Sequence, residues 1–364
     1  MGREISDRDH FVQVGVISTT AIVLLSLWFS SLFTFEVFVG WVAFISMTAV
    51  PAQIVIGMHL QFNSPSLIAS LSQPKKGLAY SGITLVLMSL SGAFLFMIPG
   101  GMAPPSPFLI NATITTIVIT FWLVAAWQCW PLVLMTNSPS AQALLTLLLA
   151  HLLGYGIYQL IFDFSGMETA PGYDISLNPR GLFDAWYALS FSVTTVAVLM
   201  VMSLFDFLPC TRLSTRQPIL GVCISTTCLL ISIVVFWFFV SFLDQDPVVF
   251  MLNISISAIF GVFLVRNMMD FKLFGQIKQP LQGFLLLIVS MCAAYLLQLL
   301  YRVVANRLFD FAVSERGAYE LEVWLATALL AITFPLINFV SGYFAFWPSK
   351  RNPYVPSHIS SVRE

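Results

Sequence analysis

Charged residues are scarce in this chain of 364 residues, since only 9% are charged and 58% are hydrophobic. Soluble domains carry roughly 25% charged residues, so this chain could not cover itself with a polar surface in water. Histidine and cysteine are also rare, with four and five copies. The cysteines fit neither a disulfide framework nor a Cys-x-x-Cys metal site. These scarcities exclude a soluble globular protein and indicate no metal centre.

Catalytic motifs are missing as well. The sequence contains no glycine-rich phosphate loop and no His-Glu-x-x-His zinc motif. Acidic residues are frequent in the loops expected outside the cell, but no histidine accompanies them to serve as a base. We therefore predict no catalytic residue, no metal and no bound cofactor, and the chain is more typical of a non-enzyme.

Long apolar runs fill most of the sequence. A helix needs about 20 apolar residues to cross roughly 30 Å of hydrocarbon, and ten runs reach that length. They cover residues 12–34, 37–60, 78–100, 109–130, 141–162, 183–207, 219–243, 248–269, 281–303 and 323–347. The sequence therefore predicts an all-α polytopic membrane protein with about ten transmembrane helices. Residues 12–347 would form one transmembrane domain.

Basic residues are distributed unevenly between the loops, and Lys and Arg favour the cytoplasmic side of a membrane. If the N-terminus is cytoplasmic, twelve basic residues face the cytoplasm: Arg3, Arg8, Lys75, Lys76, Arg212, Arg216, Arg266, Lys272, Lys278, Lys350, Arg351 and Arg363. Four face outward: Arg180, Arg302, Arg307 and Arg316. We therefore expect segment 1–11 and tail 348–364 to be cytoplasmic. The expected location is the bacterial cytoplasmic (inner) membrane.

A five-residue phrase, Gln-Pro-x-x-Gly, opens three of the apolar runs, at Gln73, Gln217 and Gln279. A degraded copy, Ser138-Pro139-Ser140-Ala141-Gln142, precedes a fourth run. Proline suits the first turn of a helix, and small residues let membrane helices approach closely. The recurrence predicts an internal repeat of two-helix hairpins, with Gly77, Gly221 and Gly283 at close helix contacts.

A second phrase ends runs four, six and ten. It contains an aromatic residue, two further residues, a bulky residue and a proline, as in Trp127-Gln128-Cys129-Trp130-Pro131. The copies at Phe205 and Phe344 have the same form. Aromatic residues favour the membrane interface and proline stops a helix. The phrase is thus consistent with a helix end at the interface, and its recurrence favours the hairpin repeat.

His151 lies near the middle of its predicted span, and an ionisable residue inside a membrane suggests a functional site. The alternatives are a neutral ring bonded to a neighbouring helix and a single-ligand haem site. His59 lies near the cytoplasmic end of its span. At 1.5 Å per residue, His151 would be roughly 15 Å deep, so the two histidines should not share one haem.

Polar side chains also recur at the cytoplasmic ends of the even-numbered spans. They are His59, Gln128, Asp206 and Asp270, with Arg266 four residues before Asp270. The alternatives are a salt-bridged rim and a cytoplasmic vestibule or gate. With His151, these residues are the candidate substrate-binding or functional residues.

Three classes of function remain. The first is a permease or transporter of lipids or small solutes without an acid-coupled ion site, because no predicted span carries a carboxylate at mid-depth. The second is a non-catalytic subunit of a larger membrane complex. The third is a membrane enzyme or haem-binding protein. The expected partners are the lipid bilayer and either other membrane subunits or further copies of this chain, and no nucleic acid.

Overall fold

The computed structural model describes residues 2–61, 63–168, 173–269, 272–309, 311 and 319–349. Within these residues, the only strands are β1 (Phe162–Asp163) and β2 (Phe183–Asp184), which pair in parallel. The same residues include ten helices that are long and apolar enough to cross a membrane. The protein is therefore an all-α integral membrane protein, as its composition predicts.

Five of the ten spans are largely surrounded by other helices. Between 61 and 83% of the residues in the most apolar stretch of each are buried. These inner spans are Phe35–Leu60, Pro107–Ala126, Ala185–Leu204, Pro247–Met269 and Glu320–Tyr343. In each of the remaining five spans, 22 to 28% of the residues in the most apolar stretch are buried. We call these five spans the outer helices. They are α1 (Gly2–Ser30), α5 (Lys75–Met97), α7 (Pro139–Ile161), α10 (Ile219–Phe236, continued by η7, Trp237–Phe242) and α13 (Leu281–Leu308).

Most inner spans combine α-helical and π-helical turns. The first comprises α2 (Phe35–Val37), η1 (Phe38–Val42), α3 (Ala43–Val55) and η2 (Ile56–Leu60), and the second α6 (Pro107–Phe121) and η3 (Trp122–Ala126). The third is α8 (Ala185–Leu204), which is α-helical throughout. The fourth comprises α11 (Pro247–Phe250), η8 (Met251–Ile256), α12 (Ser257–Leu264) and η9 (Val265–Met269). The fifth comprises α14 (Glu320–Ala326), η11 (Thr327–Thr333), α15 (Phe334–Asn338) and η12 (Phe339–Tyr343).

Short helices lie in the connections between spans. They are α4 (Ser66–Ala69), η4 (Leu132–Leu134), η5 (Ser165–Met167), η6 (Ile175–Leu177), α9 (Cys210–Leu213) and η10 (Lys272–Phe274). The longest described connection, between α7 and α8, contains η5, η6 and the two strands. Its Phe164 packs against Phe108 at the start of α6, with ring centroids 4.6 Å apart.

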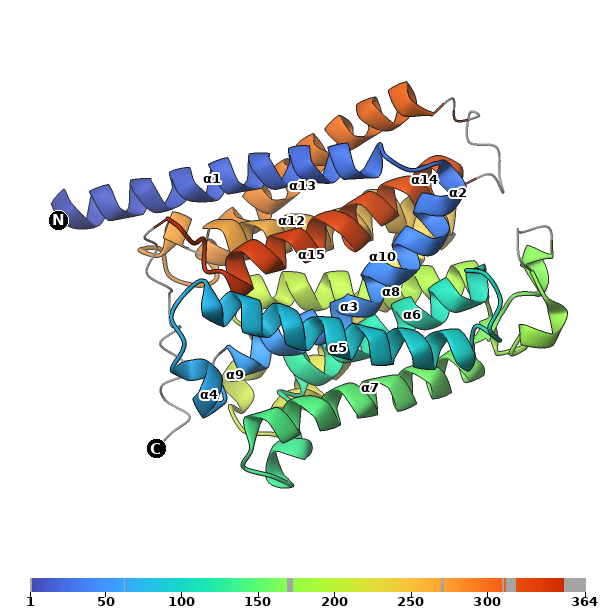
Figure 1. Ribbon diagram of the computed structural model, residues 1–364, viewed down its shortest axis with the longest axis horizontal. Helices are drawn as coiled ribbons and strands as arrows, with labels where there is room; N and C mark the ends of the chain where they lie inside the picture. Colours follow the sequence, from blue (N-terminus) through green and yellow to red (C-terminus); the bar gives the residue numbers. More distant parts are fainter. Residues whose placement is uncertain are drawn as a thin grey trace.

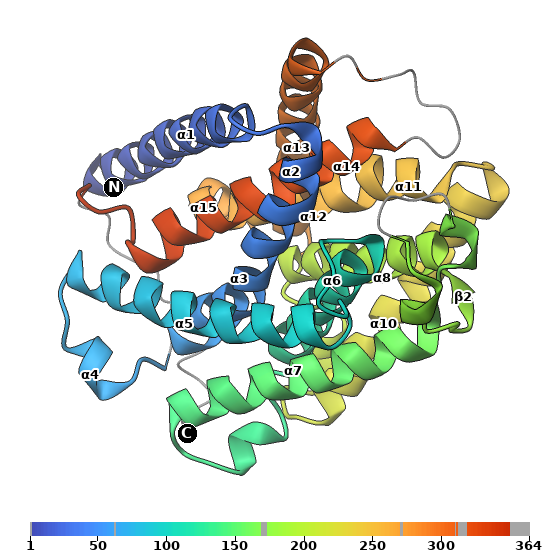
Figure 2. The ribbon, with the colours of Figure 1, turned by 45° about the vertical axis from the view of Figure 1, so that its right-hand side comes forward.

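The inner spans form a closed ring. Along it, α3 contacts α6, α6 contacts α8, α8 contacts α12, α12 contacts α15, and α15 returns to α3. Figure 1 shows the helices running in roughly one direction. In Figure 2, α1, α5, α7 and α13 lie around the outside of the inner spans. The core of the protein is therefore the space between the five inner spans.

Each outer helix packs against at least two inner spans, and two of these contacts follow a regular order, although α13 also contacts α14 and α5 also contacts α6. One is the inner span that precedes it in the chain, and the other is the inner span before that. Thus α7 contacts α6 and η2, and α10 contacts α8 and η3. The first inner span has no predecessor in the chain, so α5 contacts α3 and, in the last inner span, η12. In the same way α13 contacts α12 and α8, and α1 contacts η11 and η9. The N-terminal helix α1 thus lies beside the last inner span, in the position that an outer helix following that span would take.

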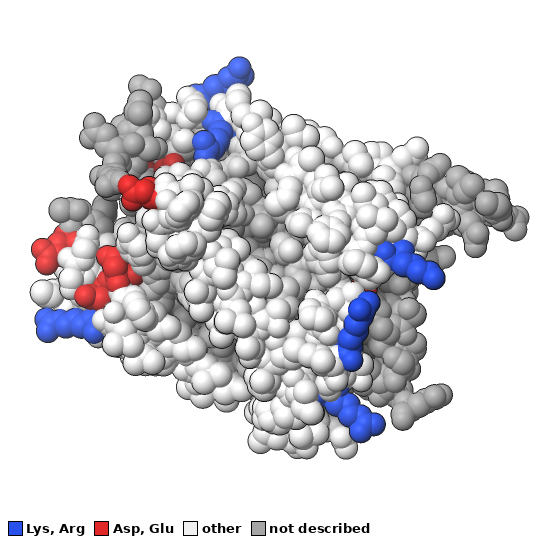
Figure 3. Space-filling model, turned by 180° about the vertical axis from the view of Figure 1, so that it is seen from behind, with Lys and Arg blue, Asp and Glu red and all other residues white. Residues whose placement is uncertain are grey.

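Charges separate along the helices. The inner spans begin near Asp163, Asp174, Asp184, Asp244 and Asp246, and the outer helices begin near Lys75, Lys76, Arg212, Arg216 and Lys278. We call these two ends of the molecule the acidic end and the basic end. Figure 3 shows the acidic side chains gathered at one end together with some basic ones, further basic side chains at the other end, and an uncharged band between the two ends. This band is what a hydrocarbon layer would cover.

Three outer helices begin with Gln-Pro-x-x-Gly, and each beginning docks against the end of an inner span. The glutamine Nε2 donates to the last carbonyl of that span, from Gln73 to Tyr343 (2.8 Å), Gln217 to Ala126 (3.0 Å) and Gln279 to Leu204 (2.9 Å). Its Oε1 accepts from the N–H of the glycine four residues later. Because the last carbonyls of a helix have no partner within it, each glutamine satisfies the end of one helix and the start of another.

The glycine of each phrase lies against the aromatic residue that follows the inner span. A Cβ atom on the glycine would lie under 3.0 Å from the ring: Gly77 with Phe344 (2.7 Å), Gly221 with Trp127 (2.9 Å) and Gly283 with Phe205 (2.5 Å). The predicted close contacts at these glycines are therefore confirmed. We call the three contacts the junctions.

The three inner spans at the junctions end earlier than the apolar runs do. The runs predicted ends at residues 130, 207 and 347, whereas the helices end at Ala126, Leu204 and Tyr343. Two residues with φ between 46 and 61° follow each junction ring: Gln128 and Cys129, Asp206 and Phe207, and Ala345 and Phe346. Left-handed residues cannot continue a right-handed helix, so the second phrase ends the span at its aromatic residue.

Candidate functional site

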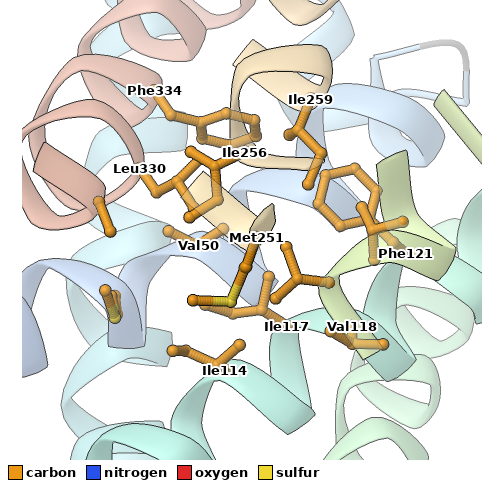
Figure 4. Close-up of a pocket in the computed structure, with 14 residues that line it drawn as sticks. Val50, Ile114, Ile117, Val118, Phe121, Met251, Ile256, Ile259, Leu330 and Phe334 are labelled. Carbon is orange, nitrogen blue, oxygen red and sulfur yellow. The ribbon is translucent and has the colours of Figure 1, made fainter. Parts of the chain in front are cut away.

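The inner spans line a partly open cavity of about 90 Å³ near the middle of their length. All five spans contribute to its wall, through Val50, Ile117, Val196, Ile259 and Leu330 among others (Figure 4). The outer helices contribute no side chain to it. The cavity therefore lies between the five inner spans, on the axis of the ring.

Every side chain that lines the cavity is apolar. Phe334 and Phe121 meet edge to face, with ring centroids 6.3 Å apart. Phe334 also stacks on Phe263, with centroids 3.8 Å apart. A water molecule needs two to four polar partners to settle in a cavity, so this cavity favours apolar groups.

Amide side chains lie about one turn from the cavity toward the basic end. Gln53 follows the lining residue Val50 by three positions, and Asn338 follows Phe334 by four. Asn338 Nδ2 donates to the backbone carbonyl of Gln53 at 3.1 Å. The Gln53 side-chain Oε1 is buried and has no hydrogen-bond partner among the described residues. An unsatisfied buried acceptor costs about 1–3 kcal/mol, so this oxygen is suited to a donor that comes from a solute.

Arg266 lies deeper toward the basic end. It follows the lining residue Ile259 by seven positions, and Ser203 follows Val196 by seven. Seven residues are close to two α-helical turns, so Ser203 in α8 lies on the stripe that faces the axis, and Arg266 lies opposite it in the π-helical segment η9. Arg266 Nη1 donates to Ser203 Oγ at 3.2 Å, which joins the fourth inner span to the third. Below the apolar cavity the axis is therefore bordered by polar groups.

One amide lies on the opposite side of the cavity, toward the acidic end. Asn111 precedes Val118, a lining residue, by seven positions. Its Nδ2 donates to the carbonyl of Pro107 at 2.8 Å. Its Oδ1 is buried without a partner among the described residues. Polar groups with unused acceptors thus flank the apolar cavity at both ends.

His151 lies in the outer helix α7 and not on the cavity wall. Its Nδ1 lies 2.7 Å from the carbonyl of Leu147 and therefore donates to it. Its Nε2 then accepts from the hydroxyl of Ser91 in α5. Both ring nitrogens are engaged, so a haem iron could bind Nε2 only if the bond to Ser91 were broken. This geometry matches the alternative of a neutral ring bonded to a neighbouring helix.

His59 and Gln128 lie at the ends of the first and second inner spans. His59 is buried and its Nε2 lies 3.1 Å from Oε1 of Gln142, so the degraded copy of the first phrase also contacts the end of an inner span. Gln128 is exposed and is the first left-handed residue after Trp127. Gln128 is thus part of a helix end.

Asp206 follows Phe205, the ring of one junction, and its carboxylate accepts a hydrogen bond from the glutamine of that junction. Its Oδ2 accepts from Gln279 Nε2 at 3.1 Å, and the residue is exposed at the basic end. Arg266 interacts electrostatically with Asp206. Asp270 lies outside the described residues. Of the candidate residues from the sequence, the structure brings Arg266 and Asp206 together near the basic end.

The sequence analysis missed the cavity and the amides Gln53 and Asn111. The available signal was composition, since buried hydroxyl and amide side chains concentrate in the inner spans, as in Thr113, Thr115, Thr116 and Thr120 of α6. Among the described residues, no group of three His, Cys, Asp or Glu side chains could hold a metal ion. No protein-family model, curated protein or solved structure matches this chain.

Proposed function

We propose that this protein is a permease for small solutes, with a route along the axis of the five inner spans. The observation that carries the proposal is the cavity to which all five inner spans contribute. A protein that served only as a packing subunit would have no need for a cavity on its axis with polar groups at either end. The route would be closed at mid-depth by the apolar wall around Phe334.

Charge placement supports transport without an acid-coupled ion. The five inner spans contain four charged residues, Glu36, Arg266, Glu320 and Glu322, and all lie near span ends. Ion-coupled transporters usually place a carboxylate or another ionisable group near the middle of the membrane. We therefore propose that the solute moves down its own gradient.

We further propose that the basic end faces the cytoplasm, since Lys and Arg favour that side. The termini would then both be cytoplasmic, in a bacterial inner membrane. The three junctions and the regular contacts of outer with inner helices support a tandem repeat of two-helix units. In this arrangement each unit is an inner span with the outer helix that follows it, and α1 completes the unit of the last span.

Transport is tested with purified protein in liposomes, by light scattering after a step in the concentration of glycerol, urea or potassium chloride. Replacing Phe334 with alanine removes the ring that contacts both Phe121 and Phe263, so flux of at least one solute should rise. Phe242→Ala is the matched control, because Phe242 is 64% exposed on an outer helix. Absence of flux in both the wild type and Phe334→Ala, with both proteins folded, would contradict the proposal.

A further inference from the structure

Two buried amide side chains lie one helical turn from the cavity wall, one toward each end of the route. On the basic side, Gln53 follows the lining residue Val50 by three positions and is 5% exposed. On the acidic side, Asn111 precedes the lining residue Ile114 by three positions and is 3% exposed. At 1.5 Å per residue, each amide lies about 4.5 Å along its helix from that lining residue. A solute that crosses the cavity therefore passes within about one turn of both amides.

The side-chain oxygens of these two amides are not used by the fold. Gln53 Oε1 and Asn111 Oδ1 are buried and have no hydrogen-bond partner among the described residues. Most buried polar atoms in proteins have such a partner, so an unused one requires an explanation. An amide oxygen accepts hydrogen bonds and cannot donate them. The two positions therefore share one chemistry, which is to accept from an N–H or O–H group.

Asn338 in the last inner span holds the backbone of Gln53 in place. Its Nδ2 donates to the Gln53 carbonyl at 3.1 Å. Its Oδ1 lies against two glycines, since a Cβ atom would lie 3.1 Å from it on Gly57 and 2.8 Å from it on Gly342. Glycine allows the backbone to approach a polar group this closely. The first and last inner spans therefore meet at a cluster of amides on the basic side of the cavity, in which Gln53 Oε1 is the unused acceptor.

The cavity between the two amides limits both the size and the charge of a solute. An apolar cavity of about 150 Å³ holds one benzene molecule, so about 90 Å³ suits a solute somewhat smaller than benzene. Every lining side chain is apolar. An ion would lose its water there without replacement, at a cost far above that of a neutral molecule. A neutral solute loses only its own hydrogen bonds and can form new ones with Gln53 and Asn111.

We propose that the route selects small neutral solutes with N–H or O–H donors, such as urea or a short diol, and that Gln53 accepts from them on the basic side. The proposal rests on the proposed function, because it names the solute class of the same axial route. A neutral solute of the same size without donors would leave both amide oxygens unsatisfied. It would therefore gain no hydrogen bond on either side of the cavity.

The test compares urea with dimethyl sulfoxide, which has a similar size and no N–H or O–H group. Flux is measured by light scattering in liposomes and corrected for protein-free liposomes, with Phe334→Ala as the parent. The parent should pass urea about fivefold faster than dimethyl sulfoxide or more. Gln53→Met removes the amide at nearly constant volume and should lower urea flux by about fivefold or more. Gln298→Leu is the matched control, since Gln298 is a buried amide in the outer helix α13 that donates to Asn253.

Melting temperature separates solute binding from a structural role of Gln53. Gln53→Met removes an unsatisfied acceptor, so its melting temperature should equal or exceed that of the parent. A lower melting temperature with unchanged urea flux would assign the oxygen to the fold and overturn the inference. If Gln53→Met does not fold, Asn111→Leu takes its place and should lower urea flux in the same way.

Two further outcomes would overturn the inference and leave the proposed function standing. One is unchanged urea flux in the folded amide variants. The other is a parent that passes dimethyl sulfoxide or potassium chloride as fast as urea. Absence of flux of any solute in the folded parent and wild type would overturn both the inference and the proposed function.

Discussion

Gly221 at the start of α10 lies directly against the indole ring of Trp127, the residue that follows the second inner span. A Cβ atom on Gly221 would come within 2.9 Å of ring carbons, which is closer than side-chain atoms normally approach. The indole ring cannot move freely, because it also stacks on Trp130 with centroids 5.7 Å apart. A Cβ atom on Gly221 would also lie 2.6 Å from Oε1 of Gln217, so both the ring and this side chain exclude it.

The first prediction concerns this contact. Gly221→Ala should lower the melting temperature in detergent, because overpacking a tight contact costs about 1–3 kcal/mol. Gly82→Ala in α5 is the control, since a Cβ there meets nothing within 4 Å. In a Trp127→Leu background, Gly221→Ala should lower the melting temperature less than it does in the wild type. The double variant should therefore be more stable than the sum of the two single effects predicts. Equal melting temperatures for Gly221→Ala and Gly82→Ala would show that the contact is loose.

The second prediction concerns the glutamine of a junction. Gln279→Leu leaves the carbonyl of Leu204 and the N–H of Gly283 without their partner, so it should destabilise the protein by about 1–3 kcal/mol. Gln282→Leu is the matched control, because it lies on the same helix and outside the junction. Melting temperatures of both variants in detergent provide the measurement. A larger loss for Gln282→Leu would mean that the junction bonds contribute little.

The number and position of the spans could be predicted from the sequence, whereas their arrangement could not. Leu199 in α8 is 1% exposed and Leu230 in α10 is 60% exposed. Both residues lie in strongly apolar runs. In a membrane, lipid-facing and protein-facing surfaces are equally apolar, so hydrophobic periodicity does not separate inner from outer spans. The cavity is lined by the inner spans alone. It could therefore not be predicted from a sequence that does not distinguish inner from outer spans.

Only the two recurring phrases of each junction could be predicted from the sequence, and not the contact between them. Both recurring phrases could be recognised, because glycine, proline and aromatic residues have strong positional preferences. That Gln217 would meet Ala126, 91 residues earlier, could not be predicted, because no local pattern specifies which helix end a glutamine will cap. The same reason explains why the partner of His151 proved to be Ser91 in α5 and not a residue of the cavity.

The third prediction concerns His151. His151→Leu removes the bonds to Leu147 and Ser91, so the melting temperature should fall while solute flux per folded protein stays unchanged. The physical reason is that His151 joins two outer helices away from the axial route. Ser91→Ala should have a smaller effect, and the double variant should resemble His151→Leu because the two groups share one bond. Loss of flux in folded His151→Leu would instead place this residue on the solute route.

The fourth prediction concerns pH and the acidic end. The pKa of Asp163 is held below its ordinary value by the hydroxyl of Ser165 first, then by the Ser165 N–H and the Asn178 amide. A lowered pKa in the folded state stabilises the fold above the ordinary value of 3.8, and this is lost as pH falls through the lowered pKa. The melting temperature of the wild type should therefore fall more between about pH 5 and pH 3 than that of Asp163→Asn. Parallel curves for the two proteins would exclude this contribution.

The most direct test of the axial route is the accessibility of a cysteine at its centre during transport. Ile117→Cys, in a Phe334→Ala background with the five native cysteines replaced by alanine, places a thiol on the cavity wall. Ile231→Cys on the lipid-facing side of α10 is the control, since Ile231 is 41% exposed. A water-soluble methanethiosulfonate reagent should block solute flux through Ile117→Cys and leave Ile231→Cys unaffected. Undiminished flux through Ile117→Cys after complete modification, or equal block of the two variants, would contradict a solute route through the inner spans.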